Sequence, residues 1–314
     1  MKNSQVREIV SDYIDIATLL NESVSLINAD DIWNIQIEGT NITGAYQAVC
    51  IIDSGVNSPH PDLADKVLNE SCFCDSGDVN GTGCCPDGNY KQEGVGSALD
   101  DNGHGTHVAG IVVANGPPKG VAFDSKIIVS KVLDENGTGH RNSDINDAMK
   151  WCISNKEIYN VSVISMSLGT YDVLYESYCD DVYEEWSDTV NDAITQDIFV
   201  DAASGNNGNT THISAPACIE DIVAVGAITK SGYVASYSNR NNITDVFAPG
   251  SDIISLRWSL NDCIEECSSC SGYYMTCSGT SMAAPHIAGV AALMKQANNS
   301  LTPAEIKDIM IRTG

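Results

Sequence analysis

The chain has 314 residues, 43% of them hydrophobic, and a formal net charge of −26 that results from 42 acidic and 16 basic residues. An acidic surface of this strength repels phosphate backbones, so nucleic acid is excluded as an expected partner. No apolar run approaches the roughly 18 residues that a membrane-spanning helix requires, so a membrane span is excluded as well. The composition therefore predicts a globular protein whose acidic surface maintains solubility.

The two ends of the chain differ from its middle. Residues 4–20 have the apolar spacing of a helix, and the first residues lack the apolar core of a signal peptide. Residues 302–305 (Thr-Pro-Ala-Glu) form a capping box, so a helix starts shortly before the chain stops. We interpret residues 1–28 as an N-terminal tail, either a residual propeptide or a linker. Residues 29–314 then form one domain that is truncated at its C-terminus.

Apolar runs bounded by turns alternate with helical patterns through the rest of the chain. Near-continuous apolar strands separated by helices are typical of a parallel sheet that is covered on both faces. The pattern predicts an α/β fold with a doubly wound, mostly parallel sheet and helices on both faces, which is a three-layer sandwich. The expected strands are residues 48–53, 126–132, 162–167, 198–203, 222–227 and 244–248.

Twelve cysteines are too many for a typical reduced cytosolic enzyme, so disulfides are expected. Two polar insertions, residues 69–102 and 256–277, carry four cysteines each, and both should lie near the functional cleft because each precedes a candidate catalytic residue. The spacing of the cysteines between 263 and 277 would also suit a zinc site. Pairing of all twelve cysteines is favoured, and the connectivity does not follow from the spacing.

Three remote segments each place a reactive side chain beside an apolar run. Asp53 closes Val-Cys-Ile-Ile-Asp-Ser-Gly, His104 starts His-Gly-Thr-His-Val-Ala-Gly, and Ser281 lies in Gly-Thr-Ser-Met-Ala-Ala-Pro-His. A serine hydroxyl needs an imidazole to take its proton and a carboxylate to orient that imidazole. Taken singly, Asp53 would be a turn residue, His104 and His107 a metal-binding pair, and Ser281 a helix cap.

The three signatures, in the order Asp, His, Ser, resemble the subtilisin-like serine proteases, or subtilases, from about residue 30 to the end of the chain. The resemblance implies that Ser281 is the nucleophile, His104 the general base and acid, and Asp53 the residue that orients His104. It also implies that Asn206, in Gly-Asn-Asn-Gly, donates to the oxyanion together with the Ser281 backbone N–H. Without the resemblance, Asn206 would be interpreted as a turn residue.

The same resemblance suggests a substrate site. Ser167, Leu168 and Gly169 resemble an edge strand that pairs with the substrate backbone, and Ala203, Ser204 and Gly205 resemble the opposite wall of the specificity pocket. Asn207 and Ser214 fall at the pocket floor, and neither is ionised. We therefore expect a neutral pocket that accepts apolar or aromatic side chains.

Metal sites are less clearly marked. Asp62 matches a residue that serves a calcium site in relatives, but the loop after the His104 helix is too short for that site, so the role of Asp62 is open. Asp75, Asp78 and Asn80 offer closely spaced oxygen ligands for structural calcium, although a solvated acidic loop fits the same composition. No cofactor is expected for the chemistry. Asp201 lies in an apolar strand, so it must be paired or face the surface.

The leading hypothesis is a secreted, monomeric serine endopeptidase that acts on polypeptide substrates through an acyl-enzyme, with a propeptide inhibitor as a further expected partner. A catalytically silent subtilisin-like binding module is the alternative. A cysteine-bound zinc protein is a third interpretation.

Overall fold

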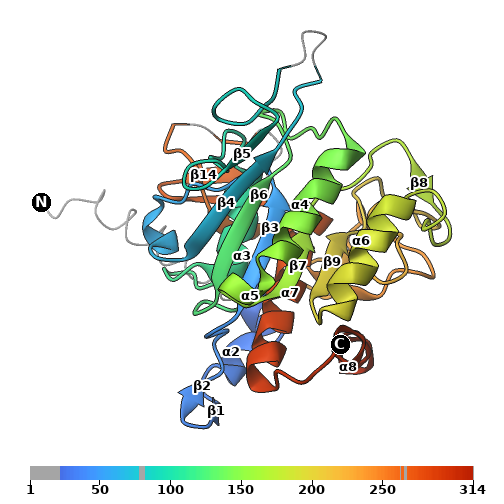
Figure 1. Cartoon of the computed structure of the whole chain (residues 1–314). Helices are drawn as coiled ribbons and strands as arrows, with labels where there is room; N and C mark the ends of the chain where they lie inside the picture. Colours follow the sequence, from blue (N-terminus) through green and yellow to red (C-terminus); the bar gives the residue numbers. More distant parts are fainter. Residues whose placement is uncertain (1–21, 78–81, 262, 265–266, 314) are drawn as a thin grey trace, which may run out of the picture.

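The computed structural model describes residues 22–77, 82–261, 263–264 and 267–313. The predicted helix at residues 4–20 lies outside the described residues. The six expected strands are present and lie side by side in one large sheet (Figure 1). Its order is β12 (Val246–Pro249), β11 (Val223–Ile228), β9 (Phe199–Ala203), β7 (Val161–Met166), β3 (Ala48–Asp53), β6 (Lys126–Lys131), β4 (Val67–Phe73) and β5 (Lys91–Glu93).

These strands pair in parallel except at one edge, where β5 runs antiparallel to β4. Every residue of β3 is buried, which explains its unbroken apolar sequence. Ile51 packs into the core on one face of the sheet, and its neighbours Cys50 and Ile52 pack into the core on the other face. The doubly wound, three-layer α/β prediction is therefore confirmed.

Two pairs of helices form the outer layers. Helices α3 (His104–Val113) and α7 (Thr280–Ala297) pack together against one face, and α4 (Asn142–Ser154) and α6 (Glu184–Thr195) cover the other. Most of α7 is buried, because its small side chains allow it to lie close to the sheet. The remaining elements are α2 (Ala29–Ile32), η1 (Pro61–Leu63), α5 (Lys156–Tyr159), α8 (Pro303–Thr313), β1 (Gln36–Ile37), β2 (Thr40–Asn41), β8 (Leu174–Tyr175), β10 (Ile213–Ser214), β13 (Ile253–Leu256), β14 (Ser269–Ser271) and β15 (Tyr274–Cys277).

Specific contacts hold the two ends of the described chain. The Thr302 hydroxyl and backbone N–H both donate to Glu305 Oε2 at 2.9 Å, so the capping box at the start of α8 is confirmed. Near the N-terminus, Val24 is buried in the core, and Ser23 Oγ lies 3.0 Å from His286 Nε2 in α7. These contacts involve residues 22–28 of the predicted tail, and the domain boundary itself stays a prediction.

All twelve cysteines form disulfides, which confirms the oxidised interpretation and leaves no thiolate for zinc. Within the described ranges, no helix has the length and apolar character needed to cross a bilayer. The six bridges are Cys50–Cys152, Cys72–Cys85, Cys74–Cys84, Cys179–Cys218, Cys263–Cys270 and Cys267–Cys277.

Candidate active site

The carboxyl end of β3 presents Asp53 to the first residue of α3. Asp53 is fully buried, and its Oδ1 lies 2.8 Å from His104 Nδ1. The same oxygen accepts the Ser54 backbone N–H at 2.7 Å. The His104 side chain is 24% exposed, so one end of the imidazole is buried against the carboxylate while the ring still reaches the solvent. This geometry matches an acid that orients a general base.

A buried carboxylate that the sequence analysis missed holds the start of α3 in place. Asp100 Oδ1 accepts the Gly103 N–H at 2.8 Å and the Ser54 hydroxyl at 2.9 Å, and its Oδ2 accepts the N–H and hydroxyl of Thr106. Asp100 therefore caps the first turn of α3 and ties it to the residue after Asp53. The N-cap position of α3 is Gly103, three residues after Asp100, so no N-cap pattern in the sequence identifies Asp100.

The second histidine of the motif has a structural role. His107 is fully buried, and its Nε2 lies 3.1 Å from Ile253 O and 3.2 Å from Met275 O. Burial and the nearby His104 lower the pKa of His107 to about 3, although the two backbone carbonyls favour protonation. It is neutral at physiological pH, and its side chain is fully buried from the solvent through which a metal ion would arrive.

Ser281 lies in the first turn of α7, where helical N–H groups have no acceptor within the helix. Its Oγ donates to Ser167 O at 3.1 Å, and the Ser167 hydroxyl donates back to Ser281 O at 2.9 Å. Ser281 and His104 line the same cleft, which has a volume of about 640 Å³. The structure thus brings together all three residues that the sequence placed far apart.

Asn206 also lines this cleft, and its orientation is fixed by α7. Asn206 Oδ1 accepts the Thr280 N–H at 2.8 Å and the Thr280 hydroxyl at 2.9 Å. A backbone N–H can only donate, so the amide oxygen must face Thr280 and the Nδ2 group is left to donate elsewhere. That arrangement suits an oxyanion donor.

Most of the residues predicted to bind substrate line the cleft, and their role in binding stays a prediction. All line the cleft except Ser204, whose buried hydroxyl donates to Asn239 O at 2.8 Å. A Cβ on Gly169 would lie 2.9 Å from the Ser214 Cβ, so glycine keeps this part of the cleft open. The members that line the cleft are Ser167, Leu168, Gly169, Ala203, Gly205, Asn207 and Ser214.

Two further walls complete the cleft, and the first of them was not predicted. Residues 136–142 line the same cleft as Leu168, and Asp134 holds them by accepting from Thr138 N at 2.9 Å and from His140 Nε2 at 3.0 Å. Burial raises the pKa of Asp134, but these hydrogen bonds outweigh burial and leave it below its usual value. On another side, the Cys267–Cys277 disulfide lines the cleft, as expected for an insertion that precedes Ser281.

The candidate calcium residues are engaged with protein groups where the structure describes them. The Asp75 carboxylate forms an ion pair with Arg141, and Asp62 Oδ2 accepts the Tyr274 hydroxyl at 2.7 Å. These side chains therefore do not fit an open cation site. Asp78 and Asn80 lie outside the described residues, so the calcium loop stays a prediction. Among the described residues, no group of three or more His, Cys, Asp or Glu side chains could hold a metal.

The position of Asp201 is now clear. It is fully buried in β9, and its Oδ1 accepts the Ser165 hydroxyl at 2.9 Å, while its Oδ2 has no hydrogen-bond partner among the described residues. Burial raises the pKa of Asp201 well above its usual value, and the bond from Ser165 offsets this only in part. Asp201 is therefore paired through one oxygen and does not face the surface.

Comparison with known proteins agrees with this geometry. The model of the subtilase family matches residues 44–314. The chain belongs to the subtilase family. Serine protease AprX of Bacillus subtilis (strain 168) is 32% identical over 320 residues, which cover 94% of this chain and 66% of AprX. The Major intracellular serine protease of the same organism is 32% identical over 285 residues, which cover 88% of this chain and 75% of that protein.

Solved subtilase structures share the fold. A cold adapted subtilisin-like serine proteinase is 30% identical with a TM-score of 0.66, and the match covers 90% of this chain and 89% of that one. Sphericase is 28% identical with a TM-score of 0.68, and the match covers 90% and 88%. The chain is thus a subtilisin-like serine protease in family and in fold.

Proposed function

We propose that this subtilase is a secreted, monomeric endopeptidase that cleaves polypeptides through an acyl-enzyme intermediate. The observation that carries the catalytic part is the 2.8 Å contact between Asp53 Oδ1 and His104 Nδ1 in the cleft that Ser281 and Asn206 also line. No metal or organic cofactor is needed for this chemistry, because the four side chains supply nucleophile, base, orienting acid and oxyanion donor.

Each group then has a defined step. Ser281 Oγ attacks the scissile carbonyl carbon while its proton moves to His104 Nε2, and Asp53 stabilises the imidazolium that forms. The carbonyl oxygen becomes an oxyanion that accepts from Asn206 Nδ2 and the Ser281 backbone N–H. His104 returns the proton to the leaving amine, and a water molecule, activated by the same imidazole, then hydrolyses the ester.

The cleft supports a neutral substrate side chain. Gly169, Gly205, Asn207 and Ser214 line one part of it, and none of them carries a charge. We propose that the extended substrate lies between residues 167–169 and the wall of residues 136–142, where exposed backbone groups can pair with it. An apolar or aromatic side chain before the scissile bond would enter the neutral part.

A fluorophosphonate probe and a peptide-library digest test this proposal together. The folded protein should be labelled at Ser281 and should cleave after apolar or aromatic residues, and the Ser281→Ala variant should do neither. Absence of labelling in a folded protein would instead support the silent binding module. Light scattering of the Ser281→Ala variant measures its mass in solution and so tests whether the protein is a monomer.

Secretion rests on the six disulfides, which persist in oxidising compartments. The relatives include both a Minor extracellular protease Epr, which is 32% identical over 96% of this chain and 40% of that protein, and intracellular serine proteases. Immunodetection in the medium and in cell extracts of the source organism decides between these locations. Detection only in the cell extract would contradict secretion.

A further inference from the structure

A lysine lies in the core directly beside the catalytic acid. Lys131 is the last residue of β6, is fully buried, and is in register with Asp53, the last residue of β3. Alternate strand residues share a face, and Ile51 and Val129, two residues earlier in each strand, pack into the same core as α3. Lys131 and Asp53 therefore project from neighbouring strands toward the same side, the side on which His104 lies.

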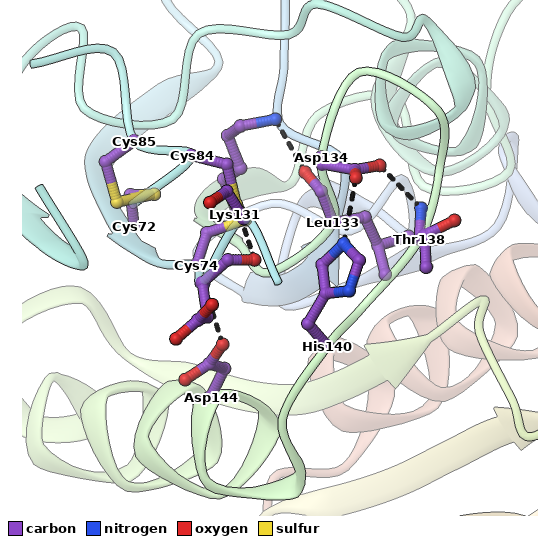
Figure 2. Close-up of a disulfide and its surroundings, with 12 residues drawn as sticks. Cys72, Cys74, Cys84, Cys85, Lys131, Leu133, Asp134, Thr138, His140 and Asp144 are labelled. Atoms are coloured by element: carbon purple, nitrogen blue, oxygen red, sulfur yellow. Dashed lines mark hydrogen bonds and ion pairs between the residues drawn. A yellow bond between two sulfur atoms is a disulfide. The ribbon is translucent and has the colours of Figure 1, made fainter. Parts of the chain in front are cut away.

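The ammonium of Lys131 uses all three of its protons within the protein. Its Nζ donates to Ser54 O at 3.0 Å, to Leu133 O at 2.6 Å and to Asp101 Oδ1 at 2.6 Å. Figure 2 shows the bond to Leu133, with the Asp134 carboxylate bridging Thr138 and His140 further along the same wall.

Each of these three acceptors belongs to a different part of the site. Ser54 follows the catalytic acid, and Asp101 precedes His104 by three residues. Leu133 lines the cleft three residues before the wall formed by residues 136–142. One buried ammonium therefore connects the acid, the base and the substrate wall. Because all three protons are held, the charge has a fixed position.

The charge around this ammonium is negative. Asp53 and Asp100 are both buried carboxylates, and Asp53 Oδ2 has no hydrogen-bond partner among the described residues. Buried carboxylates are stabilised as anions by hydrogen bonds and by nearby positive charge, and the unbonded Asp53 Oδ2 leaves a role for the charge. Lys131 is a fully buried cation in register with Asp53, and its partner Asp101 directly follows Asp100 in the chain.

We propose that Lys131 is a positioning residue of the acid–base pair. Its ammonium locks the end of β3 and supplies the fixed positive charge that keeps His104 unprotonated, and so able to accept a proton, at neutral pH. The proposal rests on the catalytic roles proposed above for Asp53 and His104, and the main experiment below does not require activity.

The direction of the effect follows from the charges near His104. Among the described residues, the titratable groups near His104 or Lys131 are Asp53 on β3, Asp100 and Asp101 in the loop before α3, and the neutral His107 on α3. His140 and Arg141 line the same cleft as His104. Loss of the cation leaves these carboxylates uncompensated, which favours the imidazolium and raises the pKa of His104. Loss of the Asp101 charge acts in the opposite direction.

NMR titration of the His104 Cε1 proton in a Ser281→Ala background measures this directly and avoids self-digestion. Lys131→Met should raise the pKa of His104 by on the order of 1 unit. Asp101→Asn, at a side chain that is 43% exposed, should lower it by about a few tenths of a unit because solvent screens its charge. Lys131→Arg, which keeps the charge, should leave it near the starting value.

The chain provides a matched control at Lys295. This lysine is 1% exposed, donates to Asp197 Oδ2 at 2.8 Å and to Leu301 O at 2.6 Å, and its aspartate partner is 44% exposed. It therefore resembles Lys131 in its burial and in its half-exposed aspartate partner, and it lies near the other end of α7. Lys295→Met should lower stability without moving the His104 titration.

The outcomes distinguish failure of the Lys131 proposal from failure of the proposed protease function. An unchanged His104 titration in folded Lys131→Met overturns the role of Lys131, and so does an equal shift in Lys295→Met. If Lys131→Met does not fold, Asp101→Asn decides, because an unchanged or raised pKa there contradicts the charge argument. Failure of the proposed function is seen separately, as absence of fluorophosphonate labelling at Ser281 in the unmodified protein.

In active protein that keeps Ser281, the acid limb of the pH profile of kcat/KM should shift among the variants in the same order as the pKa of His104. Lys131→Met should shift the limb to higher pH, whereas a role limited to holding Leu133 would raise KM and leave the limb in place. A raised KM with an unmoved limb would therefore also overturn the proposal.

Discussion

The two ends of helix α7 use polar groups in opposite ways. At the far end, Lys295 is buried and bonded to Asp197 and Leu301, and Gln296 Oε1 accepts from the backbone of residues 43–44. At the catalytic end, Asn206 uses its oxygen on Thr280 and keeps its Nδ2 group for another acceptor. Polar groups at the far end bond within the protein, whereas those at the catalytic end are fixed in place but keep capacity for a substrate.

This difference shows how one helix serves two purposes. The apolar middle of α7 packs on the sheet, which fixes the helix, and its first turn then presents Ser281 at a defined position. Substitutions at the catalytic end should therefore lower turnover with little change in stability. Substitutions at the far end should do the reverse.

The largest expected effect at the catalytic end is that of Asp53→Asn. An amide at this position can donate to His104 Nδ1, which selects the wrong tautomer and leaves Nε2 unable to accept the serine proton. We expect kcat to fall by about 10⁴-fold, the loss known for this change in another triad protease. Steady-state kinetics on a peptide substrate measure it, with circular dichroism as the control for folding. A loss below tenfold would contradict the assigned role.

A smaller loss is expected for Asn206→Ala. Removal of the Nδ2 donor should lower kcat by about 10²- to 10³-fold with KM nearly unchanged, which is the magnitude known for the equivalent donor of subtilisin. Thr280→Val is the control, because it removes one of the two bonds that orient Asn206 but keeps the donor. Its loss should be below tenfold. Equal losses in the two variants would mean that orientation, not donation, explains the effect.

Sequence reasoning was most successful where chemistry is local. The apolar run ending at Asp53 predicts both a buried strand and a functional group at its carboxyl end, and the capping box of residues 302–305 predicts the start of α8. Both depend on neighbouring residues alone. The triad and Asn206 came from motifs whose spacing is specific enough to identify a family. The structure places His104, Ser281 and Asn206 on one cleft and bonds the buried Asp53 to His104.

The features that were missed depend on contacts between remote segments. Lys131 ends an apolar strand and would ordinarily face solvent, and only the parallel register places it beside Asp53. Cys50 pairs with Cys152 across 102 residues, and no spacing rule yields that partner. Asp62 matches a calcium ligand of relatives, but the Tyr274 hydroxyl from the cysteine-rich insertion bonds to it here.

The far end of α7 can be tested with Lys295→Met, which keeps the apolar stem but removes two hydrogen bonds from a charged donor. The free energy of unfolding should fall by about 1 to 3 kcal/mol, and kcat/KM should stay within about twofold at a temperature where the variant is folded. Urea denaturation in the Ser281→Ala background measures the first quantity. Lys156→Met removes an ion pair with the exposed Glu157 and should cost less than about 1 kcal/mol. A fall in kcat for Lys295→Met would break the contrast between the two ends.

The last expected effect depends on pH and lies between the two ends, at Asp201 in β9, which packs against α7. Its carboxyl is buried and its pKa is raised well above the usual value, so the folded state keeps a proton that the unfolded state loses. The stabilisation is complete below the unfolded pKa of about 4 and is lost as the pH rises through the window up to the folded pKa. Asp201→Asn removes this dependence while keeping an acceptor for the Ser165 hydroxyl.

The wild-type free energy of unfolding should therefore fall relative to that of Asp201→Asn by about 1.4 kcal/mol per pH unit within this window. Urea denaturation between about pH 4 and pH 8, again in the Ser281→Ala background, gives the two curves. Asp188→Asn, at an exposed position on α6, is the control and should run parallel to the wild type. If the difference between wild type and Asp201→Asn does not vary with pH, the carboxyl titrates alike in both states, and its burial beneath the catalytic helix has no linked proton.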